Sequence, residues 1–404
     1  MKILMVNKFL YPNGGSEAYM FKLGEYLQAR GHKVQYFGMD NENRCVENEL
    51  NKYVSSMNLR DDKKLKQITY PLKTIYSFEA KKKIGCIIDK FKPDIVHMNN
   101  INYQLTPSII YEIKKRNIPI VQTVHDVQIV CPNHRLYIEK SRKICEKCLD
   151  GKYINCVKEK CVHGSIAKSI IAAIEAYYYH IRNTYNLVDC YICPSRFIQE
   201  KIQQGGIEKK RTNVMYNFVD KIDKKTTIRS NKRYVLYFGR LSIEKGIDTL
   251  IKVCKELKDI KFIIAGTGPL EESVKNIANV EFVGFLKGES LRELISNASL
   301  SLYPSEWYEN CPLSVIESQA LGTPVLASDL GGTKELIREN KTGKIFRAGD
   351  IDHFRNTLKE LWNNQKLLDE MSKECFKLKK YTIDSYYNDL IRVYNNLISI
   401  KEKN

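Results

Sequence analysis

The alternation of short apolar runs with amphipathic helical patterns constrains this chain more than any other feature. Residues 3–6 have the pattern of a strand, residues 16–30 that of a helix and residues 33–37 that of a second strand. This order is typical of a βαβ unit. Further strand-like runs lie at 95–97, 118–123, 190–193 and 213–216. The pattern predicts an α/β fold in which a mostly parallel sheet has helices on both faces.

A second series of the same kind follows a polar and charged stretch, residues 219–233, which is typical of an exposed linker. Its strand-like runs lie at 234–237, 261–265, 280–283, 300–303, 324–327 and 343–346. We therefore predict two doubly wound, Rossmann-like domains, at residues 1–220 and 221–380. The tail, residues 381–404, has a helical pattern and is expected to pack back on the first domain.

Length and composition agree with two globular domains. The chain has 404 residues, of which 43% are hydrophobic and 28% charged. The apolar run in residues 1–7 is too short for an export signal. The most apolar helical stretch, residues 170–181, is interrupted by Glu175 and His180 and does not suit a membrane span. We expect a cytoplasmic protein.

The net charge of +18 is concentrated in the first half of the chain. Residues 1–220 contain 35 Lys and Arg against 22 Asp and Glu, whereas the remainder contains 30 against 25. A basic domain usually faces an acidic partner. Nucleic acid and the anionic cytoplasmic leaflet of a membrane are both candidates, and composition does not choose between them.

A glycine pair follows the first predicted strand. Gly14-Gly15-Ser16-Glu17 opens the first helix, where free backbone N–H groups and the helix dipole favour an anion such as a phosphate. The alternative is a tight strand-to-helix turn capped by Ser16. The full G-x-G-x-x-G spacing is absent, which argues against a dinucleotide redox site.

The second domain opens with two cations near a strand end. Arg240 and Lys245 follow Gly239 just past the predicted strand 234–237, and Gly266 ends the next strand. In parallel α/β sheets the carboxyl ends of the strands form the ligand edge. Fixed cations at that edge can neutralise a departing diphosphate. The alternative is a solvated pair of cations in a loop.

Two glutamates lie eight positions apart in the second domain. If Pro312 begins a helix, Glu309 lies in the loop before it and Glu317 lies on the helix. Both carboxylates would then face a ligand at the helix N-terminus. The alternative is a generic acidic helix.

These residues resemble the retaining family-4 glycosyltransferases of the GT-B fold, with their Glu-x7-Glu motif and their Gly-Arg-Leu…Glu-Lys-Gly loop. Motifs in the first domain occur in the order typical of that family, so the resemblance spans nearly the whole chain. They are residues 14–17, 92–97, 123–126, 194–195 and 216–220. The resemblance implies two Rossmann-like domains facing across a cleft. The cysteines of this chain add a Cys-rich insertion in the first domain.

The resemblance also implies roles for single residues. Arg240 and Lys245 would bind the diphosphate of the donor, and Glu317 would hold the ribose hydroxyls. Glu309 would lie beside the transferred sugar, and His125 near the sugar's primary hydroxyl or the acceptor. The catalytic set is therefore His125, Glu309, Arg240 and Lys245.

The remaining donor contacts are also implied by the resemblance. The Gly14-Gly15 loop would approach the phosphates across the cleft. The other donor-binding positions are Gly239, Gly266, Asn310, Cys311, Pro312 and Leu313. The family pattern has Phe-Gly closely after the first glutamate, where this chain has Asn310-Cys311-Pro312, and this departure puts the identity of the bound sugar in doubt.

The implied reaction keeps the configuration of the anomeric carbon and uses no catalytic metal. No carboxylate pair at glycosidase spacing is recognisable in the sequence. We therefore expect attack on the same face as the departing group. The diphosphate, paired with Arg240 and Lys245, would take the proton of the acceptor.

A cysteine-rich segment at about residues 131–163 holds five of the twelve cysteines. They are Cys131, Cys145, Cys148, Cys156 and Cys161, with His134 and His163 close by. Cys145-x-x-Cys148 has the spacing of a structural zinc knuckle, and two further thiolates would complete a tetrahedral site. We expect four of the five to bind a structural zinc ion. The alternatives are buried thiols and a redox pair.

A tyrosine-rich helical pattern at residues 166–186 follows this segment. Tyrosine beside lysine and arginine suits a membrane interface, and the lysines at 81–83 would add electrostatic attraction. The alternative is packing on the sheet of the first domain.

The resemblance implies a retaining hexosyltransferase, and the basic first domain favours a place at the inner face of the plasma membrane. Its partners would be a nucleoside diphosphate sugar, a lipid-linked glycan acceptor of capsule or O-antigen synthesis and the anionic membrane surface, without nucleic acid and without a cofactor in catalysis. One alternative is a GT-B nucleotide-sugar epimerase or hydrolase. Another, from a different class, is a basic zinc-containing nucleic-acid-binding protein, against which the ordered motifs count.

Overall fold

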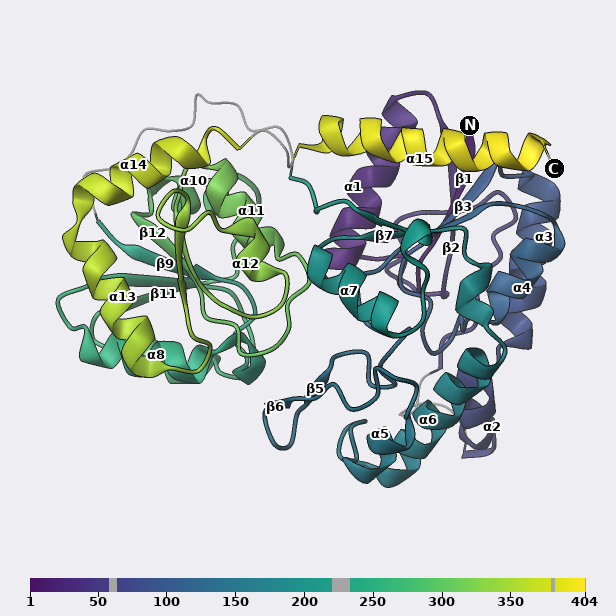
Figure 1. The fold of residues 1–404 in the computed structure, drawn as a ribbon, viewed down its shortest axis with the longest axis horizontal. Helices are drawn as coiled ribbons and strands as arrows, with labels where there is room; N and C mark the ends of the chain where they lie inside the picture. The colour runs from purple at the N-terminus through teal and green to yellow at the C-terminus, as the bar shows by residue number, and fades with distance from the viewer. Residues whose placement is uncertain (58–63, 220–232, 379–381, 404) are drawn as a thin grey trace. The chain divides into compact units, whose positions relative to one another are not determined.

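The computed structural model describes residues 1–57, 64–219, 233–378 and 382–403 (Figure 1). The chain folds into two compact units. Unit 1 consists of Met1–Tyr216 and Asp384–Asn404, and unit 2 of Asn217–Ile383. Most of the linker expected at 219–233, including the predicted boundary between residues 220 and 221, lies outside the described residues.

Unit 1 contains a six-stranded parallel sheet in the order β2-β1-β3-β4-β7-β8. Its strands are β1 (Lys2–Val6), β2 (Lys33–Phe37), β3 (Ile95–Met98), β4 (Ile120–Thr123), β7 (Cys190–Cys193) and β8 (Thr212–Val214). Its longer helices are α1 (Gly15–Ala29), α2 (Lys64–Ile75), α3 (Phe78–Phe91), α4 (Ser108–Lys115), α6 (Ile166–Ile181) and α7 (Arg196–Gln204). The strands β3, β4 and β7 are buried along their whole length, as expected for a sheet covered on both faces.

The segment between β4 and α6 forms a small substructure of its own. It holds a two-stranded antiparallel hairpin, β5 (Tyr137–Ile138) with β6 (Lys143–Ile144), and the short helix α5 (Ile154–Lys158). α5 packs on α6, and α2 packs on α6 as well. This part of unit 1 therefore presents a helix, α6, that is flanked by two others.

The C-terminal helix α15 (Ile383–Lys403) belongs to unit 1 from its second residue, Asp384, onward. Its Tyr386 hydroxyl lies 2.5 Å from the Tyr19 hydroxyl of α1, and its Tyr394 hydroxyl lies 2.5 Å from His97 Nδ1 of β3. Both tyrosines are buried. The last helix of the chain thus packs through buried aromatic contacts on the first sheet.

Unit 2 repeats the architecture with a parallel sheet in the order β11-β10-β9-β12-β13-β14. Its strands are β9 (Val235–Phe238), β10 (Phe262–Ala265), β11 (Val280–Gly284), β12 (Leu300–Tyr303), β13 (Val325–Ser328) and β14 (Gly343–Phe346). Its helices are α8 (Ile247–Glu256), α9 (Glu271–Lys275), α10 (Gly288–Asn297), α11 (Leu313–Ala320), α12 (Thr333–Leu336), α13 (Ile351–Asn363) and α14 (Gln365–Cys375). Alternate residues of β9 belong to two separate apolar clusters, so the sheet is covered on both faces.

The predicted fold class, two parallel-sheet α/β domains, is confirmed. Each strand expected from an apolar run is present within two residues of its predicted ends. The helix expected at 166–186 ends earlier, at Ile181, and a 3-10 turn, η1 (Thr184–Leu187), follows it. Within the described ranges, no helix is both long and apolar enough to cross a membrane.

Candidate active site

Two glycine loops lie against each other at the carboxyl edge of the unit 2 sheet. Gly239 follows β9 and Gly266 follows β10, and a Cβ atom on Gly266 would lie 1.9 Å from the Gly239 carbonyl oxygen. Gly266 also has a φ of +139°, in the region that favours glycine. Only glycine therefore allows these two loops to approach so closely.

The loops form a pocket of about 430 Å³ with the segment that follows β11. Its walls combine glycine backbone with apolar side chains, and Arg240 is an exposed cation on its lining. The lining residues are Phe238–Arg240, Ala265–Pro269, Phe285, Leu286 and Leu291. Phe285 is 68% exposed, which leaves an aromatic face open to a ligand. The volume lies in the range of small-molecule sites.

Lys245 and Glu309 form an ion pair in the same unit. Lys245 ends a 3-10 turn, η4 (Ile243–Lys245), and its Nζ lies 2.5 Å from Glu309 Oε1. The Glu309 side chain is 11% exposed and that of Lys245 is 20% exposed. Burial raises the pKa of Glu309, but the Lys245 charge and the hydrogen bonds to the carboxylate outweigh it and hold the pKa below its ordinary value.

Further donors hold the same carboxylate oxygen. Ser305 Oγ donates to Glu309 Oε1 at 2.8 Å, and Trp307 Nε1 donates to it at 2.5 Å. The Lys245 ammonium lies 5.5 Å from the Trp307 ring centroid, within cation–π range. Sequence reasoning missed Ser305 and Trp307. Their only signal was their position just past a predicted strand, in the loop that carries Glu309.

The two motif glutamates lie on either side of the start of α11, as expected from Pro312. Pro312 is the N-cap of α11, Glu309 lies in the loop before it, and Glu317 lies half-buried on the helix. Cys311 is 5% exposed, and its Sγ accepts a hydrogen bond from Asn217 N at 3.3 Å. The residue that departs from the family pattern therefore packs inside unit 2.

In unit 1 the predicted glycine turn begins α1. The helix starts at Gly15, its N-cap is Gly14, and no side chain caps it. The alternative in which Ser16 caps this helix is therefore wrong, because Ser16 already lies within the first turn. Its hydroxyl instead accepts a hydrogen bond from Asn100 Nδ2 at 3.0 Å.

His125 lies just after β4, at the carboxyl edge of the unit 1 sheet. Its Nε2 lies 2.9 Å from Asn99 Oδ1, and its ring packs edge-on against Tyr19 at 4.9 Å between centroids. Burial lowers the pKa of His125 to about 3, so the imidazole is neutral at pH 7. Because Asn99 and Asn100 are neighbours, they connect His125 to the start of α1.

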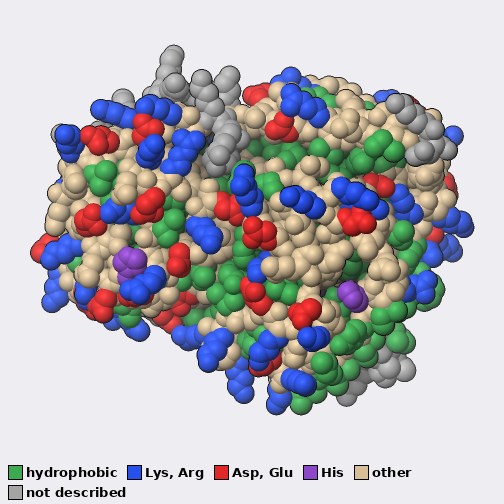
Figure 2. All heavy atoms as spheres, in the orientation of Figure 1, with side chains coloured by type: hydrophobic (Ala, Val, Ile, Leu, Met, Phe, Trp, Pro, Cys, Tyr) green, Lys and Arg blue, Asp and Glu red, His purple; other side chains and the backbone are tan. Residues whose placement is uncertain are grey.

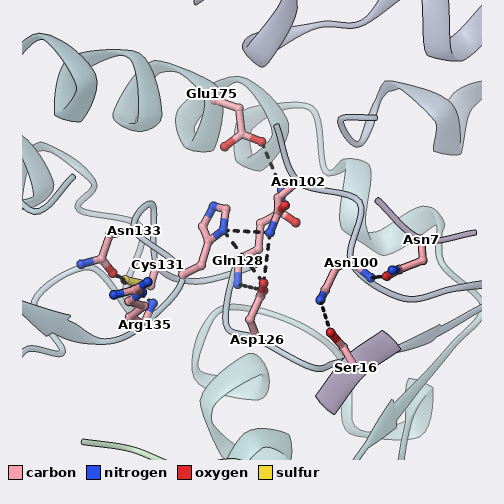
Figure 3. A network of polar contacts seen from close by, with 11 residues as sticks. Asn7, Ser16, Asn100, Asn102, Asp126, Gln128, Cys131, Asn133, Arg135 and Glu175 are labelled. Atoms are coloured by element: carbon pink, nitrogen blue, oxygen red, sulfur yellow. Dashed lines mark hydrogen bonds and ion pairs between the residues drawn. The ribbon is translucent and has the colours of Figure 1, made fainter. Parts of the chain in front are cut away.

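A polar network that the sequence did not single out continues from this point (Figure 3). Asn102 Nδ2 donates to Asp126 Oδ2 at 3.1 Å and lies 3.1 Å from His134 Nδ1. Gln128 N donates to Asp126 Oδ1 at 2.9 Å, and Gln128 Nε2 points toward Glu175 at 3.5 Å. Hydrogen-bonding side chains therefore extend from the neighbour of His125 to the buried Glu175 on α6.

The five cysteines of the insertion lie in the substructure around α5. Cys148 and Cys156 belong to one apolar cluster, against which Cys161 packs. Cys145 is half-buried, and Cys131 is buried with its Sγ 2.9 Å from Asn133 Oδ1. In the part of the chain that the structure describes, no three His, Cys, Asp or Glu residues are arranged to hold a metal ion. The predicted zinc site stays a prediction.

Comparisons with known proteins match both units. Residues 13–157 match the model of glycosyltransferase family 4, and residues 218–377 match that of glycosyl transferases group 1. The chain is 26% identical, over 355 residues, to an uncharacterized 42.6 kDa protein in the cps region of Klebsiella pneumoniae. That alignment covers 84% of this chain and 88% of its relative.

Solved structures share the whole fold at low identity. Sucrose-phosphate synthase from Thermosynechococcus elongatus has a TM-score of 0.73 and 17% identity, with 99% of each chain covered. Anabaena HepE in complex with UDP has a TM-score of 0.70 and 17% identity, with 98% of this chain and all of that chain covered. At these identities the likeness extends to the fold alone.

Proposed function

The chain belongs to the group 1 glycosyltransferases, with a family 4 domain preceding the group 1 domain, and we propose that it transfers a sugar with retention from a nucleoside diphosphate donor to a lipid-linked glycan. The observation that carries this proposal is the Lys245–Glu309 pair in the unit that also holds the glycine-loop pocket. A cation fixed by its partners suits the binding of a diphosphate that departs with growing negative charge.

The nucleoside occupies the pocket between the glycine loops. A base fits between the apolar side chains of Leu286 and Leu291 and can stack on Phe285. Backbone atoms of the loops can approach phosphate because Gly239 and Gly266 carry no side chain. Glu317 on α11 binds the ribose hydroxyls, a role that rests on the family pattern. The Anabaena structure that contains UDP supports uracil as the first base to test.

Arg240 and Lys245 carry the electrostatic part of the reaction. Arg240 is exposed on the pocket lining, and Lys245 is held by Glu309. Because an ammonium group has three N–H donors, Lys245 can bind phosphate oxygens while it keeps its bond to Glu309. The acceptor hydroxyl attacks the anomeric carbon on the face that the diphosphate leaves. The diphosphate takes the acceptor's proton, and the bond between the sugar and the phosphate oxygen breaks.

His125 acts on the acceptor side as a neutral hydrogen-bonding group. Its pKa of about 3 makes an imidazolium acid unavailable at neutral pH. Its Nε2 is directed to Asn99, so the ring orientation is fixed before substrate binds. His125 is therefore proposed to position a hydroxyl, while the departing diphosphate serves as the base.

A surface on unit 1 supports attachment to an anionic membrane at the inner face of the plasma membrane. Isoleucines recur along one face of α6 and stay exposed, while Tyr179 of the same helix is buried. The exposed ones are Ile166, Ile170, Ile174 and Ile181. Leu72 on α2 is 70% exposed, and Figure 2 shows hydrophobic side chains gathered over this part of the unit. Exposed Lys73, Lys82 and Lys168 supply the positive charge that anionic lipids attract.

The acceptor is proposed to be a lipid-linked intermediate of a bacterial surface polysaccharide. The relative encoded in a cps region supports this assignment, and so does the apolar and basic surface on α6. A structural zinc ion in the insertion is a further part of the proposal. It rests on the spacing of the five cysteines and on the shared burial of Cys148 and Cys156.

Calorimetric titration of UDP, GDP and ADP into the wild type, Lys245→Ala and Lys252→Ala tests the donor site. Lys252 is exposed on α8 and serves as the matched control. We expect micromolar binding of one diphosphate, at least tenfold weaker binding in Lys245→Ala and no change in Lys252→Ala. Absence of binding for all three diphosphates contradicts the proposal. Release of free sugar as the only product, with membrane lipids present, would favour a hydrolase.

A further inference from the structure

A second pocket lies in unit 1, and the reaction described above does not use it. It has a volume of about 320 Å³ and lies where α2 and α6 pack together. α6 contributes one helical face, spaced by three and four residues: Lys168, Ile171, Ala172 and Glu175. α2 contributes Tyr70, Pro71 and Thr74. The remaining lining residues come from loops: Tyr103, Pro132, His134, Val162 and His163.

The interior of this pocket is mostly apolar and contains one buried acid. Glu175 is 7% exposed, and burial raises its pKa to about 8, so the carboxyl is largely neutral at pH 7. Gln128 Nε2 donates a hydrogen bond to Glu175 Oε1 at 3.5 Å in the network of Figure 3. Covering a neutral carboxyl with hydrocarbon costs far less free energy than removing water from an ionised one, so the neutral form of Glu175 is compatible with a hydrophobic ligand.

Several loop residues of the pocket adopt backbone conformations that are unusual for residues other than glycine. Tyr103, His134 and His163 have φ values of +59°, +64° and +52°. Tyr103 stacks on His134 with 5.2 Å between ring centroids, and Lys8 Nζ lies 4.5 Å from the Tyr103 ring centroid. Strained backbone of this kind tends to gather at binding sites, where it holds side chains in fixed positions.

One cation lies on the lining of the same pocket and a second lies beside it. Lys168 is an exposed member of the lining, and Lys8 lies over the ring of Tyr103. A ligand with an apolar body and a phosphate at one end would match this combination, because phosphate pairs with the cations while hydrocarbon fills the interior.

The pocket also connects to the acceptor side of the proposed active site. His134 lines the pocket and lies 3.1 Å from Asn102 Nδ2, and Asn102 donates to Asp126, the residue after His125. A ligand that contacts His134 would thus be linked, through Asn102 and Asp126, to the strand edge that carries His125. This position on the acceptor side favours the lipid part of a glycan acceptor over a membrane phospholipid.

We infer that this pocket binds the first isoprene units of an isoprenyl phosphate carrier, with Lys168 at its phosphate and Ala172 against its hydrocarbon. This inference rests on the proposed function, since it assigns the lipid part of the acceptor. It adds a binding site that is separate from the donor pocket and can be tested without knowledge of the sugars.

Equilibrium binding of farnesyl phosphate below its micellar concentration tests the inference. Four full-length proteins are compared: the wild type, Ala172→Trp, which fills the pocket, Lys168→Glu, which reverses a charge on its lining, and Ala167→Trp. Ala167 is exposed on the same helix and belongs neither to the pocket lining nor to the exposed isoleucines, so Ala167→Trp is the matched control. Inorganic phosphate and dihexanoylphosphatidylglycerol are titrated in parallel, and UDP binding is measured on each protein.

We expect saturable binding of farnesyl phosphate to the wild type and to Ala167→Trp, at least tenfold weaker binding to Ala172→Trp and at least threefold weaker binding to Lys168→Glu. Lys168 is exposed, so Lys168→Glu remains informative if Ala172→Trp does not fold. No saturable binding to the wild type, equal binding to all four proteins, or equally tight binding of the glycerolipid overturns the inference. If the wild type binds farnesyl phosphate but not UDP, the donor site is contradicted and the inference about this pocket is still supported.

Discussion

Lys245 Nζ lies 2.5 Å from Glu309 Oε1, although 64 residues separate the two along the chain. Lys245 ends the turn η4 after β9, and Glu309 follows β12. Because β9 and β12 are neighbours in a parallel sheet, their carboxyl ends meet at one edge and bring the two side chains together. The pair is fixed by unit 2 itself, so the cation is in position before a donor arrives.

Replacement of Lys245 by Met should remove transition-state stabilisation while keeping most of the side-chain volume. We expect kcat/KM for sugar transfer to fall about 10²- to 10³-fold, as for loss of one preorganised donor at a developing negative charge. Initial rates at several donor concentrations measure the change. Lys252→Met should behave as the wild type, and a loss smaller than about threefold in Lys245→Met would show that this lysine does not act on the diphosphate.

The ion pair between Lys245 and Glu309 should also contribute to the free energy of unfolding. Lys245→Met leaves the mostly buried Glu309 carboxylate without its counter-ion, which should cost about 2 kcal/mol of unfolding free energy. Glu309→Gln removes the charge as well, so the double variant should be more stable than the sum of the single losses predicts, by about 1 kcal/mol. Urea unfolding of the four proteins gives this coupling. Simple additivity would mean that the ion pair contributes nothing.

Much of the fold could be predicted because the strands are short, apolar and separated by helical patterns. The run at 300–303 predicted β12 with the observed bounds, and the run at 33–37 predicted β2 equally well. Parallel pairing then follows from the βαβ order and gives the edge where Arg240 and Glu309 lie. The local pattern of apolar residues and the general rules of sheet topology were sufficient to predict the strands and the edge of the sheet at which the site lies.

The details of the site could not be predicted, since they depend on contacts between residues distant in sequence. Nothing near Cys311 indicates that its sulfur accepts a hydrogen bond from Asn217, 94 residues away. Ser16 looked like a helix cap because serine favours that position, but the helix begins one residue earlier. The α2–α6 pocket depends on tertiary packing alone, so no spacing in the sequence indicated it.

Close approach of two loops should make Gly266 intolerant of any side chain. In Gly266→Ala the new Cβ would meet the Gly239 carbonyl oxygen at 1.9 Å, at a φ that strains alanine as well. We expect a loss of about 1–3 kcal/mol and at least tenfold weaker UDP binding. Gly349→Ala is the control, because Gly349 has a φ of +73° but no atom within 4 Å of its Cβ position. Thermal unfolding measures the loss of stability and calorimetry measures UDP binding. Gly349→Ala should show the effect of backbone strain alone, and Gly266→Ala that of strain and steric clash together.

Burial of Glu175 should make stability depend on pH in an identifiable direction. Its pKa is raised to about 8 in the folded protein, above the value of about 4.3 in the unfolded chain, so the folded state binds more protons between these values. Unfolding free energy should therefore fall as pH rises from 5 to 8, by about 1 kcal/mol per pH unit from this group. Glu175→Gln should remove that slope. An identical pH dependence in wild type and variant would show that Glu175 is ionised in the fold.

The cysteine insertion should contain one zinc ion per chain. Cys148 and Cys156 share a buried cluster with Cys161 packed against it, and small metal sites of this kind stabilise segments that have little core of their own. Elemental analysis of protein purified without chelator should give about one equivalent of zinc. Cys156→Ser should lose the metal and lower the melting temperature, whereas Cys254→Ser, buried in the core of unit 2, should keep it. Absence of metal from the wild type, with all five thiols reactive after unfolding, would show that these cysteines are ordinary buried thiols.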